Sequence, residues 1–364
     1  MICLGVNTAF LDPLERSGTG VYTWSLVEQL AAEPDVDLVV FSRGGRLGIE
    51  QDDRVRVVPL PDFGSIVTRI GWEQTRLGRL AAAEGVDVLW SPGYVGPLRP
   101  RVTSVVTIHD MYYATFPEAL SSTRRLYYRL CVPRSAKAAA AVIAVSQSTA
   151  DDIAKYVDGI DSRIHTIHEA PRDLPYGREP RLRSRPYFLV TASVTKNKNI
   201  ESVESALKLM VGAGHDVEVV VAGGDPFGIL GDVMQASPVA DRLVLEIAIS
   251  DDELVSLLKG AVGLLAPSHY EGFNLPVLEA QMAGTPVIAS SAGALAEVLR
   301  DSSLTIDPDD PQTLAAAMTA LLDDDQLRLE LAAKGAKNVQ RFSWSRAARE
   351  LVDVVEAVVR EGSA

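Results

Sequence analysis

Residues 263–289 read GLLAPSHYEGFNLPVLEAQMAGTPVIA and predict, in this order, a strand, a loop, a helix and a second strand. The apolar run that begins at Gly263 stops at Pro267, and Pro276 stands near the first turn of the helix, where its missing N–H costs nothing. Gly284 is a typical helix terminator. The loop therefore leads into a helix N-terminus, whose backbone N–H groups favour an anionic ligand such as phosphate.

Two glutamates in this stretch have the chemistry to bind hydroxyl groups. Glu271 lies in the loop beside Gly272, where the missing side chain lets a ligand approach the backbone. Glu279 lies about one turn into the helix. An ionised carboxylate accepts two hydrogen bonds from a vicinal diol, such as that of a ribose or a hexose. Two arbitrary glutamates would be a solvated loop residue and a surface helix residue, but the surrounding sequence favours ligand binding here.

Short apolar runs alternate with longer helical patterns along the whole chain. Strands are predicted at 2–6, 37–41, 55–59, 86–90, 103–108, 141–145 and 163–167, and then at 187–191, 216–222, 242–246, 263–266, 286–289 and 304–306. Helices are predicted between them, among others at 21–32, 72–84, 200–211, 251–259 and 276–283. Such alternation predicts an α/β protein with parallel sheets that helices cover on both faces.

The length of 364 residues exceeds what one ordinary core holds, and it predicts two domains. The segment EAPRDLPYGREPRLRSRP is rich in Pro and Arg and has no hydrophobic period, as expected of a connection between domains. We therefore predict a first domain over 1–172, a linker over 173–186 and a second domain over 187–343. The amphipathic C-terminal helix, 344–364, is expected to pack back on the first domain.

Composition excludes several classes of function. The net charge of −13 argues against a general nucleic-acid binder, which needs clustered Lys and Arg. The two cysteines, Cys3 and Cys131, form neither a disulfide framework nor a zinc motif, and we expect buried free thiols. Met1 leads directly into a strand, and no apolar run approaches the ~18 residues of a membrane span. We expect a cytoplasmic protein.

Glu271 and Glu279, with seven residues between them and set in EGFNLPVLEAQMAGTPVIAS, resemble the donor-binding signature of the retaining glycosyltransferase family four. The resemblance covers nearly the whole chain. It implies the GT-B fold, in which two Rossmann-like domains with parallel sheets face a deep interdomain cleft. It also implies transfer of a mannose- or glucose-type hexose from a nucleotide-diphosphate sugar to a hydroxyl acceptor. Asn274 resembles the mannosyltransferase-like branch of the family, because many relatives have Gly at this place.

The resemblance assigns roles to the donor-binding residues of the second domain. Glu271 would contact hydroxyls of the transferred sugar, and Glu279 the nucleotide ribose. The sugar and the diphosphate would contact the backbone of four consecutive residues, Gly272, Phe273, Asn274 and Leu275. Gly223, which follows the predicted strand VEVVVA, would lie near the nucleotide.

The family also places an Arg and a Lys after the first strand of the second domain, where they neutralise the diphosphate. Lys198 in TASVTKNKNI matches the lysine, but Ser193 stands where the arginine is expected. Lys196 is the candidate to compensate for the missing charge. A fixed cation at this place stabilises the negative charge that develops on a leaving diphosphate.

In the first domain, the segment TIHD places His109 just after a predicted strand. The resemblance makes His109 the catalytic partner of Glu271 and Lys198, while Asp110 is expected to orient the loop. Gly18 and Gly20 resemble the glycine loop that faces the diphosphate and the acceptor. The pattern is not a dinucleotide fingerprint, because Thr23 occupies the third glycine position.

The predicted ligands are a GDP- or UDP-linked sugar donor and a hydroxyl acceptor, which is a saccharide, a lipid-linked saccharide or a small molecule. No cofactor, metal or nucleic acid is expected. The basic and aromatic stretch 124–137 (RRLYYRLCVPRSAK) is either an ordinary solvated helix face or a peripheral contact with anionic lipid at the inner membrane face. Two alternatives stay open: other GT-B chemistry, such as epimerisation or cyclitol coupling, and a non-catalytic partner subunit, which the serine at 193 favours.

Overall fold

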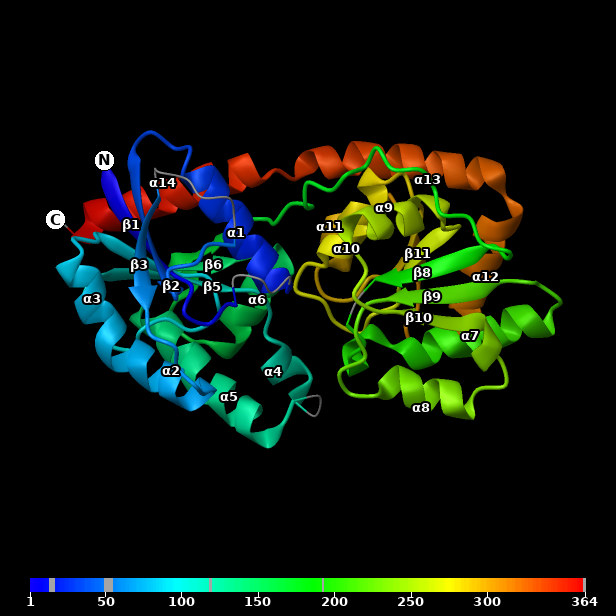
Figure 1. Cartoon of the computed structure of the whole chain (residues 1–364), viewed down its shortest axis with the longest axis horizontal. Helices are drawn as coiled ribbons and strands as arrows, with labels where there is room; N and C mark the ends of the chain where they lie inside the picture. The colour runs from blue at the N-terminus through cyan, green and yellow to red at the C-terminus, as the bar shows by residue number, and fades with distance from the viewer. Residues whose placement is uncertain (13–16, 49–54, 118–119, 192, 363–364) are drawn as a thin grey trace. The chain divides into compact units, whose positions relative to one another are not determined.

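The computed structural model describes residues 1–12, 17–48, 55–117, 120–191 and 193–362, and the chain divides into two compact units (Figure 1). Unit 1 comprises Met1–Glu169 and Ser343–Ala364, whereas unit 2 comprises Ala170–Phe342. Unit 1 is therefore discontinuous in sequence, and unit 2 is one continuous piece of chain.

A parallel sheet of seven strands forms the centre of unit 1, in the order β3-β2-β1-β4-β5-β6-β7. The strands are β1 (Ile2–Asn7), β2 (Val36–Arg43), β3 (Val55–Leu60), β4 (Val88–Ser91), β5 (Thr103–Ile108), β6 (Ala141–Ala144) and β7 (Ile164–Thr166). The middle strands are fully buried, as expected where helices cover both faces.

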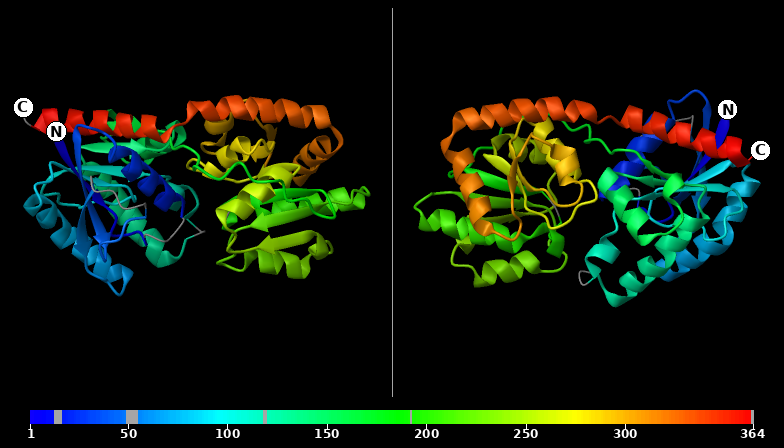
Figure 2. Two further views of the ribbon diagram at one scale, coloured as in Figure 1. Left: turned by 45° about the horizontal axis from the view of Figure 1, so that its top comes forward. Right: turned by 180° about the vertical axis from the view of Figure 1, so that it is seen from behind.

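Helices lie on both faces of this sheet. They are α1 (Gly18–Leu30), α2 (Ile66–Trp72), the π-helix η1 (Glu73–Leu77), α3 (Gly78–Ala83), α4 (Tyr112–Thr115), α5 (Ser122–Ala138), α6 (Gln147–Tyr156), the 3₁₀ turn η3 (Asp161–Arg163) and α14 (Trp344–Gly362). Helix α14 packs against α1 and β5, and in both views of Figure 2 the two ends of the chain lie at the same end of unit 1. Residues 363 and 364 of the expected C-terminal helix lie outside the described residues.

Two predicted helices of unit 1 have different bounds in the structure. Helix α1 begins at Gly18 rather than at residue 21, because the Ser17 hydroxyl accepts a hydrogen bond from the Gly20 N–H and caps the helix earlier. The helix predicted over 72–84 is present, but helical structure begins earlier, at Ile66, and contains a π-helical turn over Glu73–Leu77. A π turn inserts one residue into the helical repeat, which a pattern of period 3.6 does not reveal.

Unit 2 contains a second parallel sheet, of six strands in the order β10-β9-β8-β11-β12-β13. The strands are β8 (Tyr187–Thr191), β9 (Glu218–Ala222), β10 (Leu243–Glu246), β11 (Gly263–Ala266), β12 (Val287–Ser290) and β13 (Leu304–Ile306). The helices and turns are η4 (Lys196–Lys198), α7 (Ile200–Gly212), α8 (Ile229–Ala236), η5 (Ala240–Arg242), α9 (Asp251–Gly260), α10 (Leu275–Met282), α11 (Leu295–Leu299), α12 (Pro311–Asp323), α13 (Asp325–Asn338) and η6 (Val339–Arg341). The two parallel sheets confirm the predicted α/β class.

The segment expected as a linker, 173–186, belongs to unit 2 and is held there by ion pairs. Arg183 contacts Glu218 and also Glu246, with 2.9 Å between Arg183 Nη1 and Glu246 Oε1. Arg181 also binds Glu246, at 2.8 Å. The arginines that suggested a solvated connection therefore fasten the segment to one domain.

The strand ends decide where functional residues gather. In a parallel α/β sheet, ligands bind beyond the carboxyl ends of the strands. His109 follows β5 in unit 1, and the loop 267–274 follows β11 in unit 2. The cysteines play no part in either place, because Cys3 and Cys131 are unpaired and half-buried rather than buried as expected.

Candidate active site

The loop after β11 turns into α10 through a backbone conformation that explains its asparagine. Asn274 is the N-cap of α10 and has φ +80° and ψ +71°, in the left-handed region. Gly adopts this region most easily, and Asn is among the few other residues that visit it routinely. Asn274 thus occupies a turn that few residues other than Gly tolerate. Gly284, with φ +78°, follows the end of α10 as predicted.

Glu271 is buried and its carboxylate is held by two partners. Its Oε1 accepts hydrogen bonds from Lys198 Nζ and from Ser268 Oγ, both at 2.6 Å. The Glu271 side chain is only 8% exposed, so these contacts fix where the carboxylate points. The structure therefore brings together the glutamate and the lysine that the sequence assigned to the sugar and the diphosphate.

The backbone around Glu271 is fastened to two neighbouring loops. The amide of Asn197 donates to the Tyr270 carbonyl at 3.1 Å, and the His269 N–H donates to the Asn197 carbonyl at 2.8 Å. On the other side, a Cβ at Gly293 (φ +58°) would collide with the Glu271 carbonyl. Only glycine fits there, and this close approach holds the Glu271 backbone in place.

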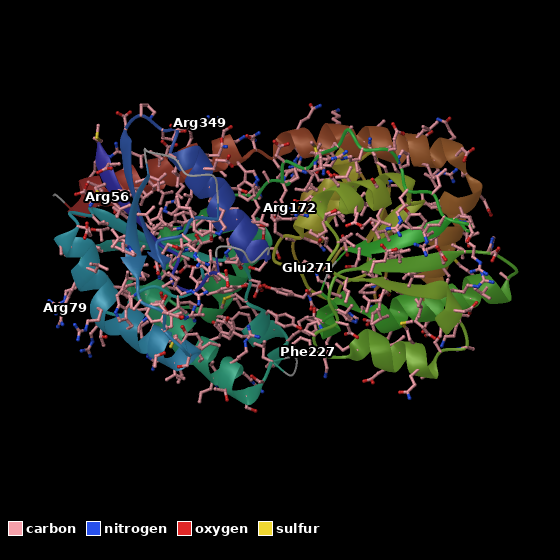
Figure 3. The ribbon with its side chains drawn as sticks, in the orientation of Figure 1. Arg56, Arg79, Arg172, Phe227, Glu271 and Arg349 are labelled. Carbon is pink, nitrogen blue, oxygen red and sulfur yellow. The ribbon has the colours of Figure 1, made fainter. Side chains whose placement is uncertain are left out.

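Glu279 is buried, with 3% of its surface exposed. Both of its carboxylate oxygens accept hydrogen bonds from Arg172, at 2.5 Å from Nε to Oε1 and 3.1 Å from Nη2 to Oε2. The third arm of the guanidinium, Nη1, donates to Asp251 Oδ1 at 3.0 Å. Arg172 and Glu271 lie at the end of unit 2 where β8 and β11 finish (Figure 3).

A small pocket opens beside these residues within unit 2. It is lined by the ends of β8 and β11 and by the start of α10, including Thr191, Lys198, Pro267, Ser268, Asn274 and Pro276. The amine of Lys198 and the N-terminus of α10 thus border the same space. Both features attract an anionic group.

The other residues predicted to bind the donor belong to the loop after β11 or follow other strands of unit 2. Phe273 and Leu275 are buried. Gly223 follows β9, and its N–H donates to the Glu246 carbonyl at 2.9 Å. Lys196 is exposed, and Ser193, also exposed, lies close to Gly224. Among the described residues, Lys196 has no ion-pair partner.

His109 in unit 1 is held at both ring nitrogens. Nδ1 lies 3.1 Å from Glu169 Oε1, and Nε2 lies 2.8 Å from the Pro92 carbonyl oxygen. A carbonyl oxygen can only accept, so Nε2 carries a hydrogen and donates it to Pro92. Both His109 and Glu169 are buried. Their contact is therefore shielded from bulk water and fixes the orientation of the ring.

The predicted glycine loop reaches His109 through its helix. Gly18 and Gly20 form the first turn of α1, and Tyr22 follows them on the buried face. The Tyr22 ring meets His109 edge to face at 4.8 Å between centroids, and its hydroxyl lies 3.2 Å from the hydroxyl of Thr107. Burial raises the pKa of Tyr22, so that its phenol stays neutral. The two glycines therefore precede, in the same helix, the tyrosine that contacts His109.

Asp110 orients the loop after His109, as expected. Its carboxylate accepts hydrogen bonds from the Tyr94 hydroxyl at 2.6 Å and from the Tyr112 N–H at 2.9 Å. Ser146 is the N-cap of α6, and Thr149 of this helix donates to the His109 carbonyl at 3.2 Å. The histidine backbone is thus fixed from both sides.

Sequence reasoning missed the residues that hold the expected ligands in place: Ser268 beside Glu271, Arg172 and Asp251 beside Glu279, and Glu169 and Tyr22 beside His109. Arg172 and Glu169 come from the segment read as a connection, and no periodic pattern marks them. The one available indication was their charge in a stretch with few apolar residues.

Comparison with known proteins agrees with this geometry. The family model described as Glycosyltransferase Family 4 matches residues 16–170, and the model described as Glycosyl transferases group 1 matches residues 178–338. The chain belongs to glycosyltransferase family 4. Together the two matches extend over most of units 1 and 2, so the resemblance seen in the sequence is confirmed.

Relatives within this family include two O-antigen enzymes. The O-antigen chain mannosyltransferase B of Escherichia coli is 26% identical over 69% of this chain and 69% of its own length. The O-antigen chain mannosyltransferase RfbU of Salmonella typhimurium is 27% identical over 85% of this chain and 88% of its own length. Other relatives are matched over a smaller share, down to 25% of their length.

The fold also has solved counterparts. Sucrose-phosphate synthase from Thermosynechococcus elongatus superposes with a TM-score of 0.79 at 20% identity, over 99% of this chain and all of that one. This match shows the two-domain GT-B fold that the resemblance implied. In the part of the chain that the structure describes, no helix is both long and apolar enough to cross a membrane.

Proposed function

We propose that this glycosyltransferase moves a mannose- or glucose-type hexose from a nucleotide-diphosphate sugar to a hydroxyl acceptor, with retention of the anomeric configuration. One observation carries the proposal: the Glu271 carboxylate and the Lys198 amine lie 2.6 Å apart beside a pocket at the start of α10. A carboxylate accepts hydrogen bonds from sugar hydroxyls, while an ammonium group and a helix N-terminus bind phosphate. Lys198 lines this pocket, and Glu271 lies next to it through its contact with the Lys198 amine.

The proposed reaction breaks the bond between C1 of the sugar and the diphosphate oxygen. The acceptor oxygen forms the new bond to C1 on the same face, and the acceptor proton passes to the leaving diphosphate. Lys198, with three hydrogens on its amine, donates to Glu271 and still has two for the phosphate oxygens. Its positive charge stabilises the developing diphosphate, so no metal ion or other cofactor is required of the proposal.

His109 is the unit 1 residue that we assign to the transfer. Glu169 and the Pro92 carbonyl fix its ring, and Tyr22 packs against it. A polar ring of fixed orientation needs no reorganisation during the reaction.

The mannose-type donor rests on the two O-antigen mannosyltransferases, which are enzymes of that sugar by name. We propose GDP or UDP as the nucleotide. A panel of nucleotide sugars screened by thermal shift selects between them, because a ligand that binds only the folded state raises the Tm. A wild-type Tm that none of the panel raises would contradict the donor assignment.

Glu271→Ala and His109→Ala test the catalytic assignment. Each should abolish transfer of radiolabelled sugar while far-UV circular dichroism stays that of the wild type. Glu201→Ala is the matched control, because Glu201 is an exposed glutamate in the first turn of α7. Full activity in both site variants would overturn the proposal.

Ser193 supports a second candidate, a non-catalytic partner subunit. The position lacks the arginine that neutralises the diphosphate in relatives, and Lys196 is exposed. Calorimetry with UDP and GDP decides between the two: binding of neither favours the non-catalytic subunit. Donor hydrolysis without acceptor transfer would instead favour other GT-B chemistry.

We also propose a cytoplasmic enzyme whose α5 contacts anionic lipid at the inner membrane face. The side chains of Arg124, Arg125, Arg129 and Leu126 in this helix are exposed, which combines positive charge with an apolar side chain. Sedimentation with phosphatidylglycerol vesicles should carry the protein into the pellet at low salt. Absence from the pellet would favour a soluble acceptor.

A further inference from the structure

The carboxylate proposed to bind the ribose is already engaged by another residue of the chain. Arg172 makes two parallel hydrogen bonds to Glu279, the fork geometry that matches a guanidinium to a carboxylate. This pair uses two of the roughly four lone-pair directions of the carboxylate, and the others stay available to a diol. Glu279 is 3% exposed, so a removed partner is not replaced by bulk water.

Arg172 also connects two parts of unit 2 that are distant in sequence. Its third arm reaches Asp251, the first residue of α9, whereas Glu279 lies within α10. Burial lowers the pKa of Arg172, but its bonds to Glu279 and Asp251 more than offset this and raise it. One guanidinium therefore faces two carboxylates, and the cluster retains a net negative charge.

We propose that Arg172 is a positioning residue of the donor site: it fixes the Glu279 carboxylate in the orientation that accepts the two ribose hydroxyls. This inference rests on the function proposed above. Without Arg172, two carboxylates remain beside a ligand that carries a diphosphate, and Glu279 is free to rotate. Both effects weaken nucleotide binding.

The opposite role, in which Arg172 occupies the place of the ribose and must leave before a nucleotide binds, predicts the opposite sign. Removal of such a plug would tighten nucleotide binding. The sign of one affinity change therefore separates positioning from obstruction.

The experiment is calorimetry on the full chain with the tighter-binding of UDP and GDP and with its 2′-deoxy form. The wild type should bind the ribonucleotide about tenfold more tightly than the deoxynucleotide, because a hydrogen bond to a charged group is lost. Arg172→Met should bind the ribonucleotide at least about tenfold more weakly and bind the two forms nearly equally. Arg172→Lys keeps the positive charge but not the two parallel hydrogen bonds. It should therefore lose less affinity for the ribonucleotide than Arg172→Met does, but should still lose most of the preference for ribose over deoxyribose.

Arg178→Met is the matched control. Arg178 belongs to the same segment and pairs with Asp252, the neighbour of Asp251 in the first turn of α9, but both side chains are about half exposed. This variant should keep the wild-type affinity and the wild-type preference for ribose.

Three results overturn the inference. They are tighter binding by Arg172→Met, unchanged affinity and ribose preference in that variant, and equal losses in Arg178→Met. A wild type that binds neither UDP nor GDP would instead overturn the proposed function on which the inference rests. If Arg172→Met fails to fold, as judged by its melting curve, Arg172→Lys supplies the decisive ratio of the two nucleotides.

Discussion

The chain passes from one unit to the other twice, and the two passages hold residues of the proposed site by different forces. At the first, Glu169 binds His109 in unit 1, and three residues later Arg172 binds Glu279 in unit 2. Each of these contacts joins a glutamate carboxylate to a basic side chain.

At the second passage the contacts are aromatic. The Phe342 ring meets Phe273 of the donor loop edge to face, at 5.7 Å between centroids, within unit 2. Two residues later, the Trp344 ring meets Tyr22, the neighbour of His109, at 6.0 Å within unit 1. Each passage thus gives one contact to each half of the proposed site.

The two kinds of contact have different effects: the first orients a side chain, and the second stabilises the fold around it. A hydrogen-bonded charge pair fixes the direction of a side chain, and it fails when either partner is removed. An edge-to-face ring pair tolerates small shifts and contributes mainly through buried area. We therefore expect changes at the first passage to reduce catalysis, and changes at the second to reduce stability.

The largest expected effect is that of Glu169→Gln. The substitution weakens the contact that orients His109 Nδ1, because a neutral amide is a weaker hydrogen-bond partner than a carboxylate. A misplaced catalytic group costs about 10²-fold in rate, and we expect kcat to fall by that order while the donor KM changes little. Steady-state kinetics with varied donor measures this. Glu179→Gln, at an exposed glutamate of the same segment, is the control.

If Glu169→Gln and Glu179→Gln gave the same kcat, the first passage would be no more than a structural connection. If Phe342→Leu lowered kcat as much as Glu169→Gln does, the two passages would not differ in their effect on catalysis.

Phe342→Ala comes next and acts on stability. Its ring is buried against Phe273 and lies under the Arg341 guanidinium at 4.8 Å. Loss of such a side chain should lower the free energy of unfolding by about 3 kcal/mol, with a smaller loss in Phe342→Leu. Urea denaturation of both variants measures the two values. Stability like that of the wild type in Phe342→Ala would show that the aromatic passage gives no support.

The smallest effect concerns Glu73, a buried carboxylate of unit 1 that serves as a reference for Glu169. Burial raises the pKa of Glu73, and this outweighs the lowering by Arg69 and by the hydrogen bond from Asn7. A raised pKa in the folded state means that its stabilisation is complete below the unfolded pKa and is lost as the pH rises through the folded value. Near neutral pH, burial of this charge therefore costs stability.

Glu73→Gln removes that cost, and we expect a Tm higher by roughly 1–3 °C at pH 8. The gain should vanish near pH 4, where the wild-type carboxyl is itself protonated. Differential scanning calorimetry at both pH values checks this. A gain that did not change with pH would mean that the charge of Glu73 has no part in it.

Strands were the part of the fold most accessible from sequence. The apolar runs of β1, β5 and β11 are short and bounded by polar or turn residues, so their bounds are nearly those predicted. The start of α1 was not accessible, because it depends on one hydrogen bond from Gly20 to Ser17. The π turn within 72–84 was equally hidden, since its apolar spacing resembles that of an ordinary helix.

For the candidate site, the sequence indicated the groups that would bind a ligand but not those that hold them. Glu271 and Glu279 lie in one motif with seven residues between them, and Lys198 follows the first strand of the second domain. Glu169 and Arg172 lie in a segment without any period, and their partners are distant in sequence. Contacts of this kind depend on how the chain is routed between domains, which residue patterns do not encode.

The continuous course of unit 2 has a consequence for how such enzymes diversify. An exchange of residues 170–342 with those of a relative would transfer a donor half together with Arg172 and Phe342, the residues that brace it. Glu169 and Trp344 would remain behind with the histidine that they support. The two boundaries between the units thus fall between these contacts. Recombination at the two boundaries would exchange the donor-binding unit and leave each of the four residues beside the residue that it contacts.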